Sequence, residues 1–139
     1  MADVSFTATA IKATATTLTE PGTLGEASIT QGMALYKSSG KWYIADCTTS
    51  ATTAAASGIA LGAGGTDQRI QIATGGDITV DNLSISAAGD KGVYVLSAAG
   101  KIAPAADLAE DDYLTIIGAA SAATTLKLAF KATGVQITA

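Results

Sequence analysis

The feature that most constrains the fold is a similarity between two parts of the chain that lie sixty residues apart. A gap-free alignment at this offset places five residues of the first part on matching residues of the second: Gly32 on Gly92, Met33 on Val93, Leu35 on Val95, Gly40 on Gly100 and Lys41 on Lys101. The same offset places Gly58 on Gly118 and Ile70 on Phe130, and deletion of one residue places 73–80 on 132–139. Internal repetition restricts the architecture, because each copy folds into the same supersecondary unit.

We therefore predict two tandem β units, residues 25–80 and 84–139, which share one core in a single domain over residues 25–139. Residues 1–24 precede this domain as an extended arm. The alternative that stays open is a chance similarity in a chain rich in Ala, Thr and Gly.

The first unit opens with a predicted β-hairpin from Gly25 to Asp46. Residues 33–36 alternate as a half-buried strand requires, and 42–44 form a second run with high β propensity. Between them lies a polar loop with Gly40 late in it, where a short hairpin commonly needs positive φ.

Short β-prone segments separated by Gly-rich and Asp-rich turns continue along the chain. We expect strands at residues 58–61, 68–73, 113–119 and 125–132, a small polar connection at 47–57, and a turn at 75–77. In the last of these strands, Leu126, Leu128 and Phe130 share one face. No long amphipathic helix is visible, so the predicted fold is all-β, a small antiparallel β-barrel or sandwich. Hydrophobic residues make up 48% but aromatics 5%, so the core should rely on Val, Ile, Leu and Ala.

The arm has strand patterning of its own. Val4, Phe6 and Ala8 alternate with Ser and Thr, and a Thr-rich tract follows up to the turn at residues 20–22. A terminal strand either closes the sheet of its own domain or crosses to the edge of a neighbour. Both readings remain open, and the candidate protein-interaction residues are Val4, Phe6, Ala8 and Ile11.

Charge and composition disfavour several classes of partner. With 8 basic and 12 acidic residues the net charge is −4, and the lysines are scattered, so no basic patch suits a nucleic acid. Apolar runs are too short for a membrane span, and the first ten residues lack the pattern of a signal peptide. We expect synthesis in a reducing cytoplasm, consistent with the single Cys47.

Candidate chemistry is sparse. The chain has no histidine, which removes the commonest general base and most zinc sites, and a lone Cys47 lacks a partner base. The acidic residues around Asp112 match no EF-hand spacing and read as a solvated turn. We predict a protein that is not an enzyme, with no catalytic residue, no metal and no cofactor. A carbohydrate-binding module would need an exposed aromatic platform, for which Trp42, Tyr36 and Tyr43 are the available group, but an anchor for the hairpin explains these residues better.

The stretch from Gly25 to Leu61 resembles the opening of small phage capsid decoration, or cement, proteins. In that family a Gly-Glu or Gly-Asp step leads into a hairpin ending in Lys-hydrophobic-x-Ala-Asp, followed by an Ala-rich connection and a Gly-Ile-Ala-Leu strand. The matching residues here are Gly25-Glu26, Lys41 to Asp46, Gly58 to Leu61, Gly89-Asp90 and Val93 to Val95. The resemblance covers about residues 25–119 and does not include the Thr-rich arm.

The resemblance implies a structural protein on the outside of an icosahedral head, made in the cytoplasm of the bacterial host. It implies a homo-oligomer, with a trimer favoured, that binds the major capsid protein and clamps neighbouring subunits. The alternative is another virion module built from the same β units, in a tail tube, a baseplate or a head-fibre attachment.

Overall fold

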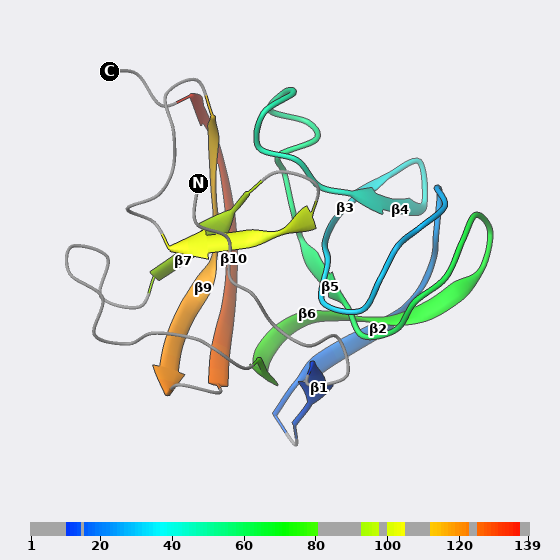
Figure 1. The fold of residues 1–139 in the computed structure, drawn as a ribbon, viewed down its shortest axis with the longest axis horizontal. Helices are drawn as coiled ribbons and strands as arrows, with labels where there is room; N and C mark the ends of the chain where they lie inside the picture. Colours follow the sequence, from blue (N-terminus) through cyan, green and yellow to red (C-terminus); the bar gives the residue numbers. More distant parts are fainter. Residues whose placement is uncertain are drawn as a thin grey trace.

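The structure, a computed structural model, describes residues 11–14, 16–80, 93–97, 100–104, 112–122 and 125–136. Within these residues the chain is all-β and contains no helix, as the sequence predicts. The strands form an antiparallel sheet that curls into a half-barrel (Figure 1). They are β1 (Lys12–Ala13), β2 (Leu18–Thr23), β3 (Ala34–Ser38), β4 (Lys41–Ile44), β5 (Gly58–Ala60), β6 (Arg69–Thr79), β7 (Val93–Leu96), β8 (Ile102–Pro104), β9 (Tyr113–Ala122) and β10 (Thr125–Gln136).

The main path of the sheet runs β4-β3-β5-β6-β10-β9-β7-β8, and β1 and β2 pair with β6 beside it. In the part of the chain that is described, β4 and β8 lie at the two ends of this path and do not pair with each other. The sheet is therefore open, whereas a closed barrel has no free edges.

The β3–β4 hairpin has the predicted form. Its strands pair Leu35 with Ile44 and Ser38 with Lys41 across a two-residue turn. The turn residues Ser39 and Gly40 have φ of 52° and 80°, the combination that a type I′ turn requires and that matches the twist of the flanking strands.

Strand β6 links the two halves of the sheet. Its first part pairs with β2 and β5, and its last part, from Gly76 to Thr79, pairs with β10 and, at its end, with β1. The predicted turn at residues 75–77 is wrong, because the strand continues through this point with a local bend. Gly76 has φ of 74°, and a Cβ there would overlap the carbonyl oxygen of Thr16. Glycine permits both the left-handed backbone and the close approach.

The Thr-rich tract crosses this bend and belongs to the domain. The hydroxyl groups of Thr14 and Thr17 both donate hydrogen bonds to the Asp77 carbonyl oxygen, the first at 3.1 Å. Together with β1 and β2 these contacts join residues 11–14 and 16–24 to β6, so these residues form part of the sheet and not of an extended arm. Tertiary hydrogen bonds to β6 decide this, and no local pattern in the Thr-rich tract encodes them.

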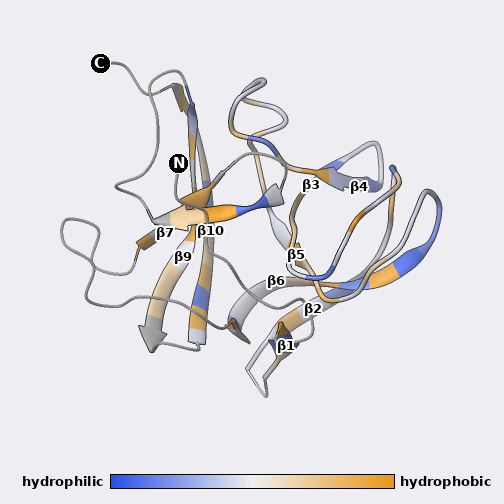
Figure 2. Cartoon of the chain, viewed as in Figure 1, coloured by the Kyte–Doolittle hydropathy of each residue, from blue (hydrophilic) through white to orange (hydrophobic). Residues whose placement is uncertain are grey.

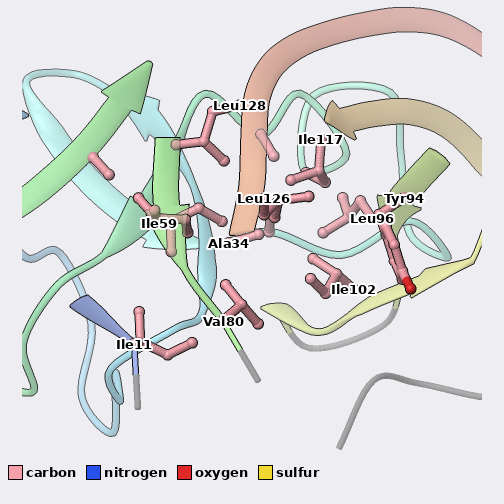
Figure 3. Packing of buried hydrophobic residues seen from close by; sticks show 14 of the residues in the cluster. Ile11, Ala34, Ile59, Val80, Tyr94, Leu96, Ile102, Ile117, Leu126 and Leu128 are labelled. Atoms are coloured by element: carbon pink, nitrogen blue, oxygen red, sulfur yellow. The ribbon is translucent and has the colours of Figure 1, made fainter. Parts of the chain in front are cut away.

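Two clusters of buried side chains support the sheet. The larger cluster draws from both halves, with Ala34 and Ile59 from the first and Leu96, Ile117 and Leu126 from the second (Figure 3). The smaller cluster lies within the first half, around Leu35, Trp42 and Ile72. Full burial of each large aliphatic side chain contributes about 1.5–3 kcal/mol, so the shared cluster adds to the β6–β10 pairing in holding the halves together. Aliphatic residues and alanine dominate it, as the composition predicts.

The β9–β10 hairpin shows the predicted alternation. Leu126 and Leu128 are buried, and Phe130 packs against the shared cluster, while Lys127 and Lys131 are exposed. Figure 2 shows the resulting change between hydrophobic and hydrophilic residues along β10. The strand therefore places one face on the core and one toward solvent.

The two halves pair their strands in the same order, but the gap-free alignment is wrong in register. In the first half β3 pairs with β4 and β5, and β5 with β6; in the second, β7 pairs with β8 and β9, and β9 with β10. Leu35 pairs with Ile44 and Gly58, whereas the residue paired with Pro104 and Gly118 is Tyr94 and not Val95.

The offset also fails between β6 and β10. Ala73 pairs with Ile59, but the residue paired with Ala119 is Lys127 and not Ala132, on which the alignment places Ala73. Register depends on nonlocal pairing and on bulges, which a sequence alignment does not contain. A common origin of the two halves stays a prediction.

We predict that Gly76→Ala lowers the free energy of unfolding by at least about 3 kcal/mol, since it adds a backbone clash to the left-handed strain of about 1 kcal/mol. Gly40→Ala is the matched control: its φ is 80° but nothing lies within 4 Å of its Cβ position. It should therefore lose about 1 kcal/mol, from strain alone. Urea unfolding of both variants measures the difference, and equal losses would contradict the assigned role of the bend.

Candidate functional site

The predicted interaction residues fall into two groups. Val4, Phe6 and Ala8 lie outside the described residues, and their role stays a prediction. Ile11 is 1% exposed and belongs to the shared cluster of this chain, and its carbonyl oxygen accepts a hydrogen bond from Gln31 Nε2. The assignment of Ile11 as a contact residue is therefore corrected: its side chain anchors the N-terminal segment in its own core.

The Gly25-Glu26 step closes the outer edge of β4. The Gly25 amide donates to the Trp42 carbonyl oxygen at 2.7 Å, and the Ile44 amide donates to Glu26 Oε1 at 2.5 Å. A Cβ at position 25 would overlap the Tyr43 ring. These contacts satisfy backbone groups that an exposed edge strand otherwise offers to another chain. The sequence analysis noted the Gly25-Glu26 pair before the hairpin only as part of a family resemblance. The hydrogen bonds in the structure show that this pair covers the edge of β4.

The aromatic residues of the hairpin do not form an exposed platform. Trp42 is 2% exposed within the smaller cluster, with Lys37 Nζ 5.6 Å from its ring centroid. Tyr36 and Tyr43 are half-buried and stack on each other, with ring centroids 5.6 Å apart. The interpretation of Trp42 as a hairpin anchor is confirmed, and Trp42 offers no ring face to a sugar.

Two exposed ion pairs hold the hairpin to its neighbours. Lys41 Nζ lies 2.7 Å from Asp67 Oδ1, and Lys37 Nζ lies 3.8 Å from Glu20 Oε1. The hydrogen bond that Lys41 donates to the Asp67 carboxylate, followed by the negative charge of Asp67, raises the pKa of Lys41. Exposed pairs of this kind are screened by solvent and orient the hairpin more than they stabilise it.

Cys47 lies at the junction of the two halves and is fully buried. Its amide faces the Ser97 carbonyl oxygen at 3.4 Å, and its own carbonyl oxygen accepts a hydrogen bond from the Tyr113 amide at 2.7 Å. Burial, followed by the nearby charge of Asp112, raises the pKa of the thiol to about 12. Because the thiolate is the nucleophilic form, Cys47 is a structural side chain at neutral pH.

Buried polar groups at the same junction bond to the backbone. The Thr115 hydroxyl donates to the Ala54 carbonyl oxygen, and the Gly100 amide donates to the Ala45 carbonyl oxygen at 2.6 Å. The sequence analysis did not single out Thr115, because a single threonine in an apolar strand does not indicate a hydrogen bond to a distant part of the same chain. These contacts make the connection at residues 47–57 part of the core between the halves.

The remaining sequence candidates carry no site in the described part of the chain. Of the acidic cluster, Asp107, Glu110 and Asp111 lie outside the described residues, while Asp112 is buried beside Cys47. Among the described residues no three His, Cys, Asp or Glu side chains come together as metal ligands. The Gly-rich loop at 62–65 is a turn in which the Gly65 amide donates to Gln68 Oε1 at 2.7 Å.

Comparisons with protein-family models, with curated proteins and with solved structures found no match. In the stretches that the structure describes, no helix is long and apolar enough to cross a membrane.

We predict that Ile11→Ala lowers the free energy of unfolding by about 2–5 kcal/mol, because it leaves a cavity in the shared cluster. Lys12→Ala, at the adjacent exposed position, serves as control and should change it by less than about 0.5 kcal/mol. Chemical unfolding of the two variants provides the measurement. Similar, small effects would mean that the N-terminal segment is not anchored in the core.

We predict a stability loss at high pH that depends on Cys47. Above about pH 9, the ordinary pKa of a cysteine thiol, Cys47 ionises in the unfolded chain, while in the folded chain its pKa is raised to about 12 and the thiol stays protonated. The folded state then binds more protons, so stability present below pH 9 falls as the pH rises toward 12, by up to about 1.4 kcal/mol per pH unit. Unfolding of wild type and Cys47→Ala across this range isolates the effect, and parallel pH profiles would contradict it.

Proposed function

We propose that this chain is a structural virion protein, a phage capsid decoration protein that binds the outside of the head and stabilises contacts between subunits of the major capsid protein. The proposal assigns it no catalytic role. It starts from the resemblance at Gly25-Glu26, Lys41 to Asp46 and Gly58 to Leu61, and takes a homotrimer as the expected oligomer.

The observation that carries the proposal is how the chain uses its polar side chains. Glu26, Gln31, Thr17 and Thr115 each bond to a backbone group of the same chain, at an edge, a bend or a junction. The buried thiol of Cys47 stays protonated at neutral pH. Side chains engaged in this way brace a rigid body, which is what a protein that clamps other subunits requires.

The physical action of such a protein is linkage. A protein that binds across the joint between two capsid subunits removes apolar surface from water only when both subunits are in place. Binding to the assembled state alone then stabilises that state by mass action. A low density of charge, 14% of residues, suits contacts between protein surfaces.

We also propose that the two halves derive from one duplicated β unit. The equal order of strand pairing supports this, and so do the glycines of the two hairpins: Gly40 and Gly100 have φ of 80° and 77°. If the halves share an origin, the β7–β8 hairpin has gained one residue relative to β3–β4. The pairing of β10 with β9 has also shifted relative to that of β6 with β5.

The proposed attachment segment is now shorter than the arm predicted from sequence. Since Ile11 is anchored in the core and β1 starts at Lys12, the segment that can reach a partner ends at residue 10. We propose that Val4, Phe6 and Ala8 lie on a neighbouring protomer or capsid subunit as an added strand, with main-chain hydrogen bonds for affinity.

The second candidate is another virion module, in a tail tube, a baseplate or a head-fibre attachment. The same rigid β body with an N-terminal segment fits those places as well. Gold labelling of intact particles separates the two, because a decoration protein is distributed over the whole head surface.

We predict that deletion of Ala2–Ala10 abolishes binding to heads that have been stripped of this protein, while the domain still folds because Ile11 and β1 remain. Sedimentation of heads with bound protein provides the measurement. The matched variants are Val4→Ser with Phe6→Ser, which should lose binding, and Ser5→Ala with Thr7→Ala, which should retain it. Full occupancy by the deleted protein would refute attachment through this segment.

A further inference from the structure

Among the described residues, one edge of strand β10 has no partner strand along part of its length. On the side away from β9 it pairs with β6 only through residues 125–128, and no other described strand pairs with that side beyond Leu128. In Figure 1 β10 runs on beside β9 after its contact with β6 ends. The Val135 amide is occupied by the Thr133 hydroxyl at 3.1 Å, so the open part is Ala129 to Thr133. This contrasts with the edge of β4, which Gly25 and Glu26 close.

The side chains along the open edge define what an added strand must look like. Phe130 packs partly against the shared cluster and remains half-exposed, whereas Ala129, Lys131 and Ala132 are exposed. An added strand therefore needs large apolar side chains on the core face beside Phe130. On the outer face, beside Lys131, it needs small polar ones.

The sequence at residues 4–8 has this pattern. Val4, Phe6 and Ala8 supply an apolar face, and Ser5 and Thr7 a small polar one. The segment is five residues long, as is the open edge, and neither contains a proline that would remove a ladder hydrogen bond. Phe6 opposite Phe130 would form a cross-strand aromatic pair.

The direction of the chain favours a second copy as the donor. Lys12 pairs with Thr79 of β6, and Thr79 also pairs with Thr125 at the start of β10. Read from Ala13 to Lys12, β1 therefore points toward the end of β10 that is opposite to Ala129–Thr133. Pairing with its own open edge would require the segment to reverse direction directly after leaving the core.

We infer that the edge of β10 from Ala129 to Thr133 is the docking site for residues 4–8 of a second copy of this chain. This rests on the proposed function in one respect, that the N-terminal segment is a contact segment, and it names the acceptor. Such an exchange is heterologous, so it closes into a ring where the rotation between copies allows.

Disulfide trapping in the purified protein tests the inference. The full chain carries Cys47→Ala, to remove the native thiol, together with Lys131→Cys and, in two separate variants, Ser5→Cys or Thr7→Cys. Ser5 lies opposite Lys131 in an antiparallel pair and Thr7 in a parallel pair, both on the outer face. Mild oxidation should yield reducible dimers and larger species on a denaturing gel. The matched control replaces Lys131→Cys by Lys127→Cys, on the same face of β10 but beside Asp77 of β6, and should lose the cross-link.

The cross-linking result tests docking between copies, and head binding by the deleted protein tests the proposed function, so one proposal can fail without the other. An intramolecular cross-link, an absence of cross-link, or equal cross-linking of the two lysine positions would overturn docking between copies. Unchanged unfolding midpoints of the variants show that folding is not the cause. Loss of head binding on deletion of Ala2–Ala10 without any cross-link would retain the attachment segment but assign its acceptor to the capsid.

Discussion

The structure depends on one strand that bends without ending. β6 pairs with the first half of the sheet up to Gly75 and with β10 from Gly76 onward, so a single backbone carries hydrogen bonds to both halves. The bend needs a residue without Cβ because the Thr16 carbonyl group lies against it. The hydroxyl groups of Thr14 and Thr17 then satisfy the Asp77 carbonyl oxygen. The Thr-rich tract and the Gly75-Gly76 pair, which are far apart in sequence, therefore together form the bend in β6.

A second principle is the treatment of edges and junctions. Strand β4 lies at one end of the described sheet, and Gly25 and Glu26 form hydrogen bonds with the backbone groups on its outer edge. Where the halves meet, Cys47 and Thr115 bond to backbone groups across the junction. Closing one edge prevents nonspecific pairing, and we propose a specific pairing for an edge that has no partner strand among the described residues. β10 beyond Leu128 is such an edge.

These features together describe a rigid body with few reactive groups and one N-terminal segment anchored at Ile11. Such a body suits a protein whose work is to add buried surface between other subunits, since the free energy of binding is not lost in ordering the body itself. The proposed roles in a virion follow from this mechanical character and from the sequence resemblance, and they share one requirement, a contact segment outside the core.

The sequence alone determined the elements whose evidence is local. The alternation at residues 125–132 assigned the faces of β10 because side chains alternate with a period of two. Gly40 marked the hairpin turn because positive φ is local backbone chemistry, and Trp42 was assigned as an anchor of the hairpin. Only the tertiary structure decided that Gly76 lies within a strand, that Ile11 is a core residue, and that Tyr94 and not Val95 is the register partner of Gly118. Those three outcomes depend on which distant backbone supplies the hydrogen bonds and which cavity receives the side chain, and no local pattern contains that information.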